Sequence, residues 1–164
     1  METSEAITSL VNIAALFFVG AQVLLARRAI RNTTAAQQDE WSRLRKQATI
    51  DASISTAQYR ESLKADLPWN DRDPGEVAEF LRAAAGDPEK LAPVRQYLNH
   101  LEDVAVGVKQ KVLDIDTLSM LSGSRIVDTV DNYASHIENV RKQLKRPQIY
   151  IELEELANRL RTLN

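Results

Sequence analysis

The stretch VRQYLNHLEDVAVGVKQKV, Val94–Val112, sets the fold class of this chain. Its apolar residues recur at alternating spacings of four and three, close to the 3.6-residue period of an α-helix. The six positions of this stripe are Val94, Leu98, Leu101, Ala105, Val108 and Val112. A stripe of this kind predicts an amphipathic helix that packs one face against a core.

Three further apolar stripes with helical spacing lie on either side of this stretch. One precedes it at 77–84, one follows at 126–144, and one closes the chain at 149–163. The turn-forming segments LPWNDRDPGE (67–76) and KRPQ (145–148) separate them. Glycine and proline each occur only 5 times in 164 residues, and no segment alternates with the two-residue period of a strand. The sequence therefore predicts an all-α fold.

Several helix ends can be predicted from local chemistry. Asp73 is expected to cap a helix whose first residue is Pro74, because aspartate accepts from free N–H groups and proline lacks one. The regular part of the next helix is predicted to start near Ala92, and 113–125 to form a short helical turn. In the long segment before Pro68, the apolar positions change register to Ile50, Ile54 and Ala57.

The amino-terminal run AITSLVNIAALFFVGAQVLLA, 6–26, carries no charge, and Arg27, Arg28 and Arg31 follow it. A bilayer core needs about 20 apolar helical residues, so the run predicts a transmembrane helix, with a buried core helix and a cleaved signal peptide as alternatives. A signal peptide would carry its positive charges before the run. The basic collar Arg27, Arg28 and Arg31 predicts a bacterial inner-membrane location, with the amino terminus outside and lipid as one partner.

These features predict four parts of the chain. Residues 1–5 form an extracytoplasmic tail, 6–26 the transmembrane helix, 27–65 a basic juxtamembrane stalk helix, and 74–163 a small antiparallel helical bundle. The formal net charge of −2 gives no overall attraction for nucleic acid. We therefore expect no nucleic-acid partner.

The sequence offers no constellation of catalytic or metal-binding residues. Cysteine is absent, which excludes a thiolate nucleophile and a cysteine zinc site. The two histidines, His100 and His136, lack the helical spacing of metal ligands and are expected at the surface. No glycine-rich phosphate loop occurs. We predict no enzyme activity, no cofactor, no metal and no small-molecule substrate.

Two charged residues lie unusually close to apolar stripes. Glu102 lies about 40° from Leu98 around its helix, and Arg141 lies about 40° from Ile137 around another. A charge beside a core needs a partner, because an unpaired buried charge is costly. We predict that Glu102 and Arg141 form a structural pair that joins two helices.

The segment YLNHLEDVAVGVK, with later matches at Gly123–Ile126 and in IYIELEELANR, resembles the bacterial domain-of-unknown-function family 4760. The resemblance implies a small single-pass membrane protein with a helical domain after its anchor, and the family carries no assigned activity. The residues that best carry the resemblance, called here the motif residues, are Tyr97, Asn99, Glu102, Gly107, Lys109, Arg125 and Tyr150.

The sequence favours a membrane-tethered helical interaction module as the function. It would hold a protein partner, or its own copies as a homo-oligomer, at the inner face of the membrane. The alternative is a membrane-perturbing or pore-forming effector of a phage or defence system. The absence of charge in the apolar run disfavours a conducting pore, because ion pathways are usually lined by polar or charged groups.

Overall fold

The computed structural model describes residues 34, 36–68 and 70–163. The chain divides into two compact units, Met1–Arg43 and Leu44–Asn164. In the first unit, residues 36–43 are helical. The second unit contains the core and every site considered below.

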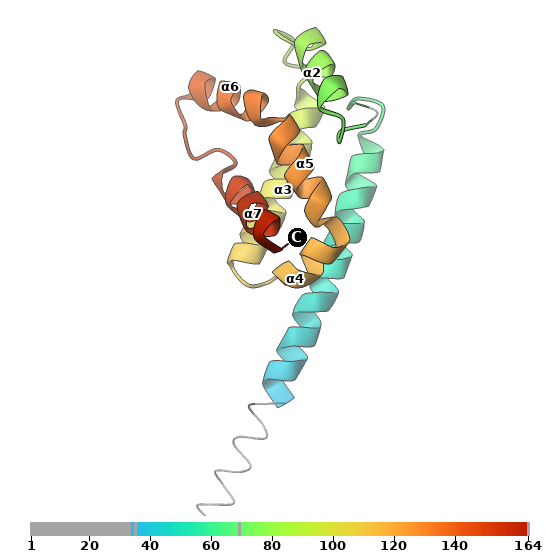
Figure 1. Ribbon diagram of the computed structural model, residues 1–164, viewed down its shortest axis with the longest axis vertical. Helices are drawn as coiled ribbons and strands as arrows, with labels where there is room; N and C mark the ends of the chain where they lie inside the picture. The colour runs from blue at the N-terminus through green and yellow to red at the C-terminus, as the bar shows by residue number, and fades with distance from the viewer. Residues whose placement is uncertain (1–33, 35, 69, 164) are drawn as a thin grey trace, which may run out of the picture. The chain divides into compact units, whose positions relative to one another are not determined.

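The second unit is built from helices, and its described residues contain no strand. It begins with a helix at 44–62, and Figure 1 shows the elements that follow. They are α2 (Pro74–Ala83), α3 (Ala92–Lys109), α4 (Ile115–Leu118), the π-helix η1 (Ser119–Gly123), α5 (Ser124–Asn132), α6 (Ala134–Leu144) and α7 (Ile151–Leu163). The all-α prediction is confirmed.

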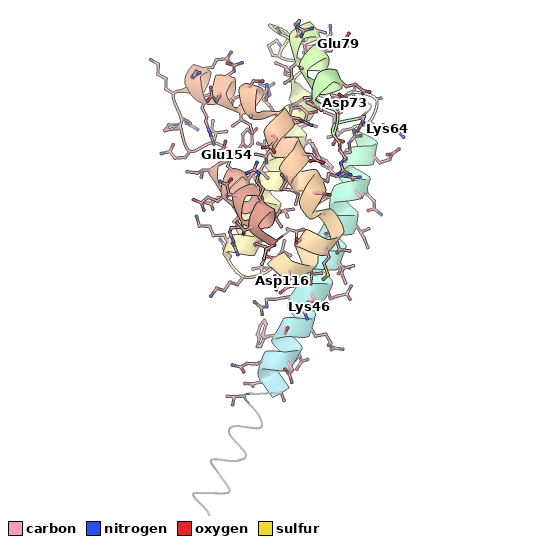
Figure 2. The ribbon with its side chains drawn as sticks, in the orientation of Figure 1. Lys46, Lys64, Asp73, Glu79, Asp116 and Glu154 are labelled. Carbon is pink, nitrogen blue, oxygen red and sulfur yellow. The ribbon has the colours of Figure 1, made fainter. Side chains whose placement is uncertain are left out.

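The predicted start of α2 is also confirmed. Asp73, labelled in Figure 2, accepts hydrogen bonds from the backbone N–H groups of Gly75 at 2.7 Å and Glu76 at 3.3 Å. Pro74 is the first helical residue, where its missing N–H is not needed. The next helix, α3, begins at Ala92 as predicted.

Helix α3 forms the centre of the core and packs against α7, which in turn packs against α5. Five of the six stripe residues are buried: Val94, Leu98, Leu101, Ala105 and Val108. The sixth, Val112, is 55% exposed. The helix has already ended at Lys109, and Lys111 adopts a left-handed backbone with φ of 59°. Chain reversal at this point removes Val112 from the apolar face.

The apolar stripe at 126–144 predicted one helix, and the structure contains two. Helix α5 ends at Asn132 and α6 begins at Ala134, with Tyr133 between them at φ −96° and ψ 6°. Tyr133 is completely buried. The stripe continues across the break because both helices bury apolar residues, so periodicity alone does not reveal the change of direction.

The predicted inner-membrane location requires correction. In the ranges 36–68 and 70–163, no helix is both long and apolar enough to cross a bilayer. The transmembrane helix predicted at 6–26 and the basic collar of Arg27, Arg28 and Arg31 lie outside the described residues. This finding contradicts the predicted single-pass inner-membrane location.

Candidate interaction groove

Glu102 caps a helix that lies far from it in the sequence. Its carboxylate accepts hydrogen bonds from the backbone N–H of Leu153 at 2.7 Å and of Glu152 at 3.4 Å. Both N–H groups belong to the first turn of α7, where the helix cannot satisfy them itself. Burial raises the pKa of Glu102, and the two N–H groups oppose that shift. Glu102 therefore fixes the start of α7 against α3.

The predicted pairing of Glu102 with Arg141 is wrong. Arg141 makes two bonds to Glu154 on α7, at 3.0 and 2.8 Å, and a third to the Ile149 carbonyl at 2.8 Å. Glu154 is labelled in Figure 2. Each charge near a core does find a partner, as expected. The partners come from the segment 149–154, whose path the helical-wheel argument could not supply.

A double-mutant cycle distinguishes the two pairings. We expect Arg141→Leu and Glu154→Leu each to lower the free energy of unfolding, with a coupling of about 1–3 kcal/mol because the pair is bidentate and half-buried. The cycle of Arg141→Leu with Glu102→Leu should show a smaller coupling, because Glu102 bonds the α7 backbone and the Arg141 charge acts on it only weakly. Urea unfolding measures both. A larger coupling to Glu102 than to Glu154 would contradict the observed geometry.

Other motif residues also stabilise the fold. Lys109 bonds Glu152 at 2.6 Å. A Cβ added to Gly107 would lie 3.0 Å from the Leu113 side chain, so a small residue allows the chain to turn back over α3. Tyr150 is buried with a left-handed backbone at φ 59°. Asn99 is exposed on α3. Tyr97 and Arg125 line a cavity.

That cavity is an open groove with a volume of about 440 Å³. One wall is the helix at 44–62, which contributes Ile50, Ser53, Ile54, Thr56 and Ala57. The floor comes from α3, with Tyr97 and Leu101. The other wall comes from η1 and α5, together with one arginine from the loop before α2: Leu121, Ser122, Ser124, Arg125, Ile126 and Arg72. We call this feature the apolar groove.

Large apolar side chains remain exposed at the rim of the apolar groove. Ile54 is 53% exposed and Leu121 is 52% exposed. Ile50, one turn before Ile54, also lines the groove and is 37% exposed. A π-helix widens the turn between α4 and α5, and such turns are frequent at functional sites. Contiguous exposed apolar surface of this kind is typical of interaction sites.

Several polar groups of the apolar groove have no hydrogen-bond partner among the described residues. Arg72 bonds Asp128 at 2.7 Å. Arg125 is exposed and makes no hydrogen bond or ion pair with the residues the structure describes. The Ser53 and Tyr97 hydroxyls are buried without a partner there. Thr129 lies close enough to affect the Tyr97 pKa, yet the two hydroxyls make no bond of normal geometry.

A buried ion pair lies behind the floor of the apolar groove. Arg60 bonds the Asp71 carboxylate at 3.1 Å and the Pro68 carbonyl at 2.9 Å. The Asp71 carbonyl accepts from Asn132 of α5 at 2.9 Å. Burial raises the pKa of the Tyr97 hydroxyl, Asp71 acts in the same direction, and Arg125 opposes them. Tyr97 therefore remains a protonated donor near neutral pH.

The expectation that both histidines lie at the surface is wrong. His100 is half-buried and shares a 2.9 Å hydrogen bond with Thr56, which joins α3 to the helix at 44–62. His136 is 7% exposed and lines a second, smaller cavity of about 170 Å³. Within 36–68 and 70–163, no three His, Cys, Asp or Glu side chains gather as metal ligands would.

Stability should fall in mild acid because of His136. Burial lowers its pKa, with the charge of Arg95 acting in the same direction. Below about pH 6.5 the unfolded chain takes up this proton more readily than the folded one, so stability present at higher pH is lost. We expect His136→Gln to reduce the difference between urea midpoints at pH 7.5 and pH 5.5. An unchanged difference would contradict a depressed pKa.

Sequence reasoning found the components of the apolar groove but not the groove itself. The register change placed Ile50, Ile54 and Ala57 on one face of that helix, and all three line the groove while remaining exposed. Tyr97 and Arg125 were identified only through the family resemblance. The sequence did not point to Ser53 or Leu121, because nothing in the local pattern indicates that 113–125 contains a π-helix beside the helix at 44–62.

Comparison with known proteins agrees with the resemblance seen in the sequence. No curated protein and no solved structure matches the chain. The family described as "Domain of unknown function (DUF4760)" matches residues 6–160. This match covers α2 to α6, α7 as far as Leu160, the apolar groove and all seven motif residues. The chain therefore belongs to the DUF4760 family, a domain whose function is not known.

Proposed function

We propose that this protein is a non-enzymatic helical interaction module that holds a protein partner in the apolar groove. The observation that carries the proposal is the exposed apolar rim formed by Ile50, Ile54 and Leu121. A protein segment lying across the rim would remove all three side chains from water, which is the main favourable contribution to association.

The contacts of three charged residues near the core support a non-enzymatic module. Glu102, Lys109 and Arg141 are bonded to the first turns of α7 or to the segment before it. These bonds give all three residues a role in stabilising the fold.

Site-specific photo-crosslinking tests this proposal in the full-length protein. A benzophenone amino acid replaces Ile54 or Leu121 in the native cells, and Val112 or Leu144, which are similarly exposed elsewhere, as controls. We expect both groove positions to give an adduct with one and the same protein, identified by mass spectrometry, and the control positions to give none.

Two results would contradict the proposal. Groove positions that crosslink no more than Val112 and Leu144 would show that the rim has no partner. An adduct between two copies of this chain would show a homo-oligomer in place of a separate partner.

A further inference from the structure

We propose that the partner segment bound in the apolar groove carries a carboxylate, which inserts between Tyr97, Ser53 and Arg125. This inference rests on the proposed function and specifies the chemistry of the partner. It assigns a binding role to polar groups that the fold itself leaves unused.

The first argument is charge complementarity. The groove lining contains two arginines and no acidic residue, in a chain whose formal net charge is −2. Arg72 is already paired with Asp128. Arg125 has no acidic partner among the described residues, so its guanidinium is available to bind an anion. Arginine binds carboxylates through two parallel hydrogen bonds, which fixes their orientation.

The second argument is the state of the buried hydroxyls. Tyr97 is 1% exposed, lines the floor, and its hydroxyl has no partner in the described part of the chain. The Ser53 hydroxyl, on the wall formed by the helix at 44–62, is also buried without a hydrogen-bond partner among the described residues. A buried polar group without a hydrogen bond costs about 1–3 kcal/mol. An acceptor that enters the groove removes this cost, and a carboxylate can accept from several donors at once.

The third argument is the apolar surround. Ile50, Ile54, Leu101 and Ile126 line the same groove. These side chains provide no hydrogen bonds, so they favour an aliphatic body attached to the carboxylate over a strongly hydrated anion such as phosphate. A glutamate or a terminal carboxylate among apolar residues of a partner meets these requirements.

Calorimetric titration of the full-length protein tests the inference with octanoate as the probe. Octanol, which has the same chain without the charge, and octylammonium, which has the opposite charge, serve as matched ligands. We expect saturable binding of octanoate at one site, with at least tenfold weaker binding of the other two. This factor corresponds to about 1.4 kcal/mol, the scale of one charge-assisted hydrogen bond.

Variants locate the bound carboxylate. We expect Arg125→Gln to weaken octanoate binding about tenfold and Tyr97→Phe about fivefold, since each removes a donor. Arg159→Gln, an exposed arginine on α7, and Tyr150→Phe are the matched controls and should bind as the wild type does. Melting curves verify that each variant is folded. Octanol binding equal to octanoate binding, or full binding by Arg125→Gln, would overturn the inference.

Failure of the crosslinking experiment can be distinguished from failure of the octanoate titration. Crosslinks from Ile54 and Leu121 without octanoate binding would leave the interaction module in place and overturn the carboxylate. Octanoate binding without crosslinks would overturn a partner's carboxylate as the source and show a site for a free small carboxylate. Support requires both results, with octanoate also reducing the crosslink yield.

Discussion

Replacing Asp71 with alanine is expected to lower the free energy of unfolding by about 3–5 kcal/mol, the range measured when one member of a buried ion pair is removed. The Asp71 and Arg60 side chains are only 8% and 10% exposed. Without Asp71, the Arg60 charge remains desolvated behind the groove floor, held only by the Pro68 carbonyl. A domain of this size has about 5–15 kcal/mol in total, so the loss should be evident in urea unfolding.

A second variant separates loss of the pair from loss of packing. The double change Arg60→Met with Asp71→Leu leaves no unpaired charge and should recover a large part of the loss. Glu138→Ala is the surface control, because Glu138 and its partner Lys142 are both well exposed, and it should change stability by about 0.5 kcal/mol or less. Equal losses for Asp71→Ala and Glu138→Ala would contradict a buried, stabilising pair.

The sequence predicts what depends on neighbouring residues. Asp73 caps α2 and Ala92 begins α3 because both effects act within one helical turn. The stripe at 94–108 is buried as predicted because helical period alone determines which side faces the core. The prediction that Val112 is buried is wrong because α3 ends at Lys109. The left-handed turn at Lys111 contains no glycine that would indicate this end in the sequence.

Partners across the fold could not be predicted in the same way. A helical wheel shows that Glu102 and Arg141 lie near a core, but it does not show what faces them. The partners are the α7 backbone and Glu154, and both depend on the path of the irregular segment at 145–150. The apolar groove is similarly non-local, since its walls come from segments about 70 residues apart in sequence, at 50–57 and 121–126.

Six of the seven motif residues therefore divide into two groups by what they contact, and the seventh, Asn99, is exposed on α3. Glu102, Gly107, Lys109 and Tyr150 shape the connection between α3, α7 and the turns beside them. Tyr97 and Arg125 line the apolar groove. This division gives a physical criterion for substitutions: changes in the first group should act on stability, and a change at exposed Arg125 should act on binding while leaving the melting temperature nearly unchanged.

Tyr133→Ala is expected to lower the free energy of unfolding by about 3–5 kcal/mol, the cost of deleting a large aromatic side chain from a core. Tyr133 is completely buried at the junction of α5 and α6. Its ring fills the space where the chain changes direction. The cavity left by alanine would remove packing from both helices at once, and the residue after the break, Ala134, is too small to replace it.

Tyr133→Phe separates the ring from its hydroxyl. The Tyr133 hydroxyl is buried and has no hydrogen-bond partner in the part of the chain that the structure describes, and burial raises its pKa. Removing an unsatisfied buried hydroxyl costs nothing in bonds and relieves desolvation, so phenylalanine should be neutral or stabilising by up to about 1 kcal/mol. Urea unfolding of the wild type and both variants measures the two effects. A loss greater than about 1 kcal/mol in Tyr133→Phe would show that the hydroxyl is bonded in solution, and the break between α5 and α6 would then depend on that bond as well as on the ring.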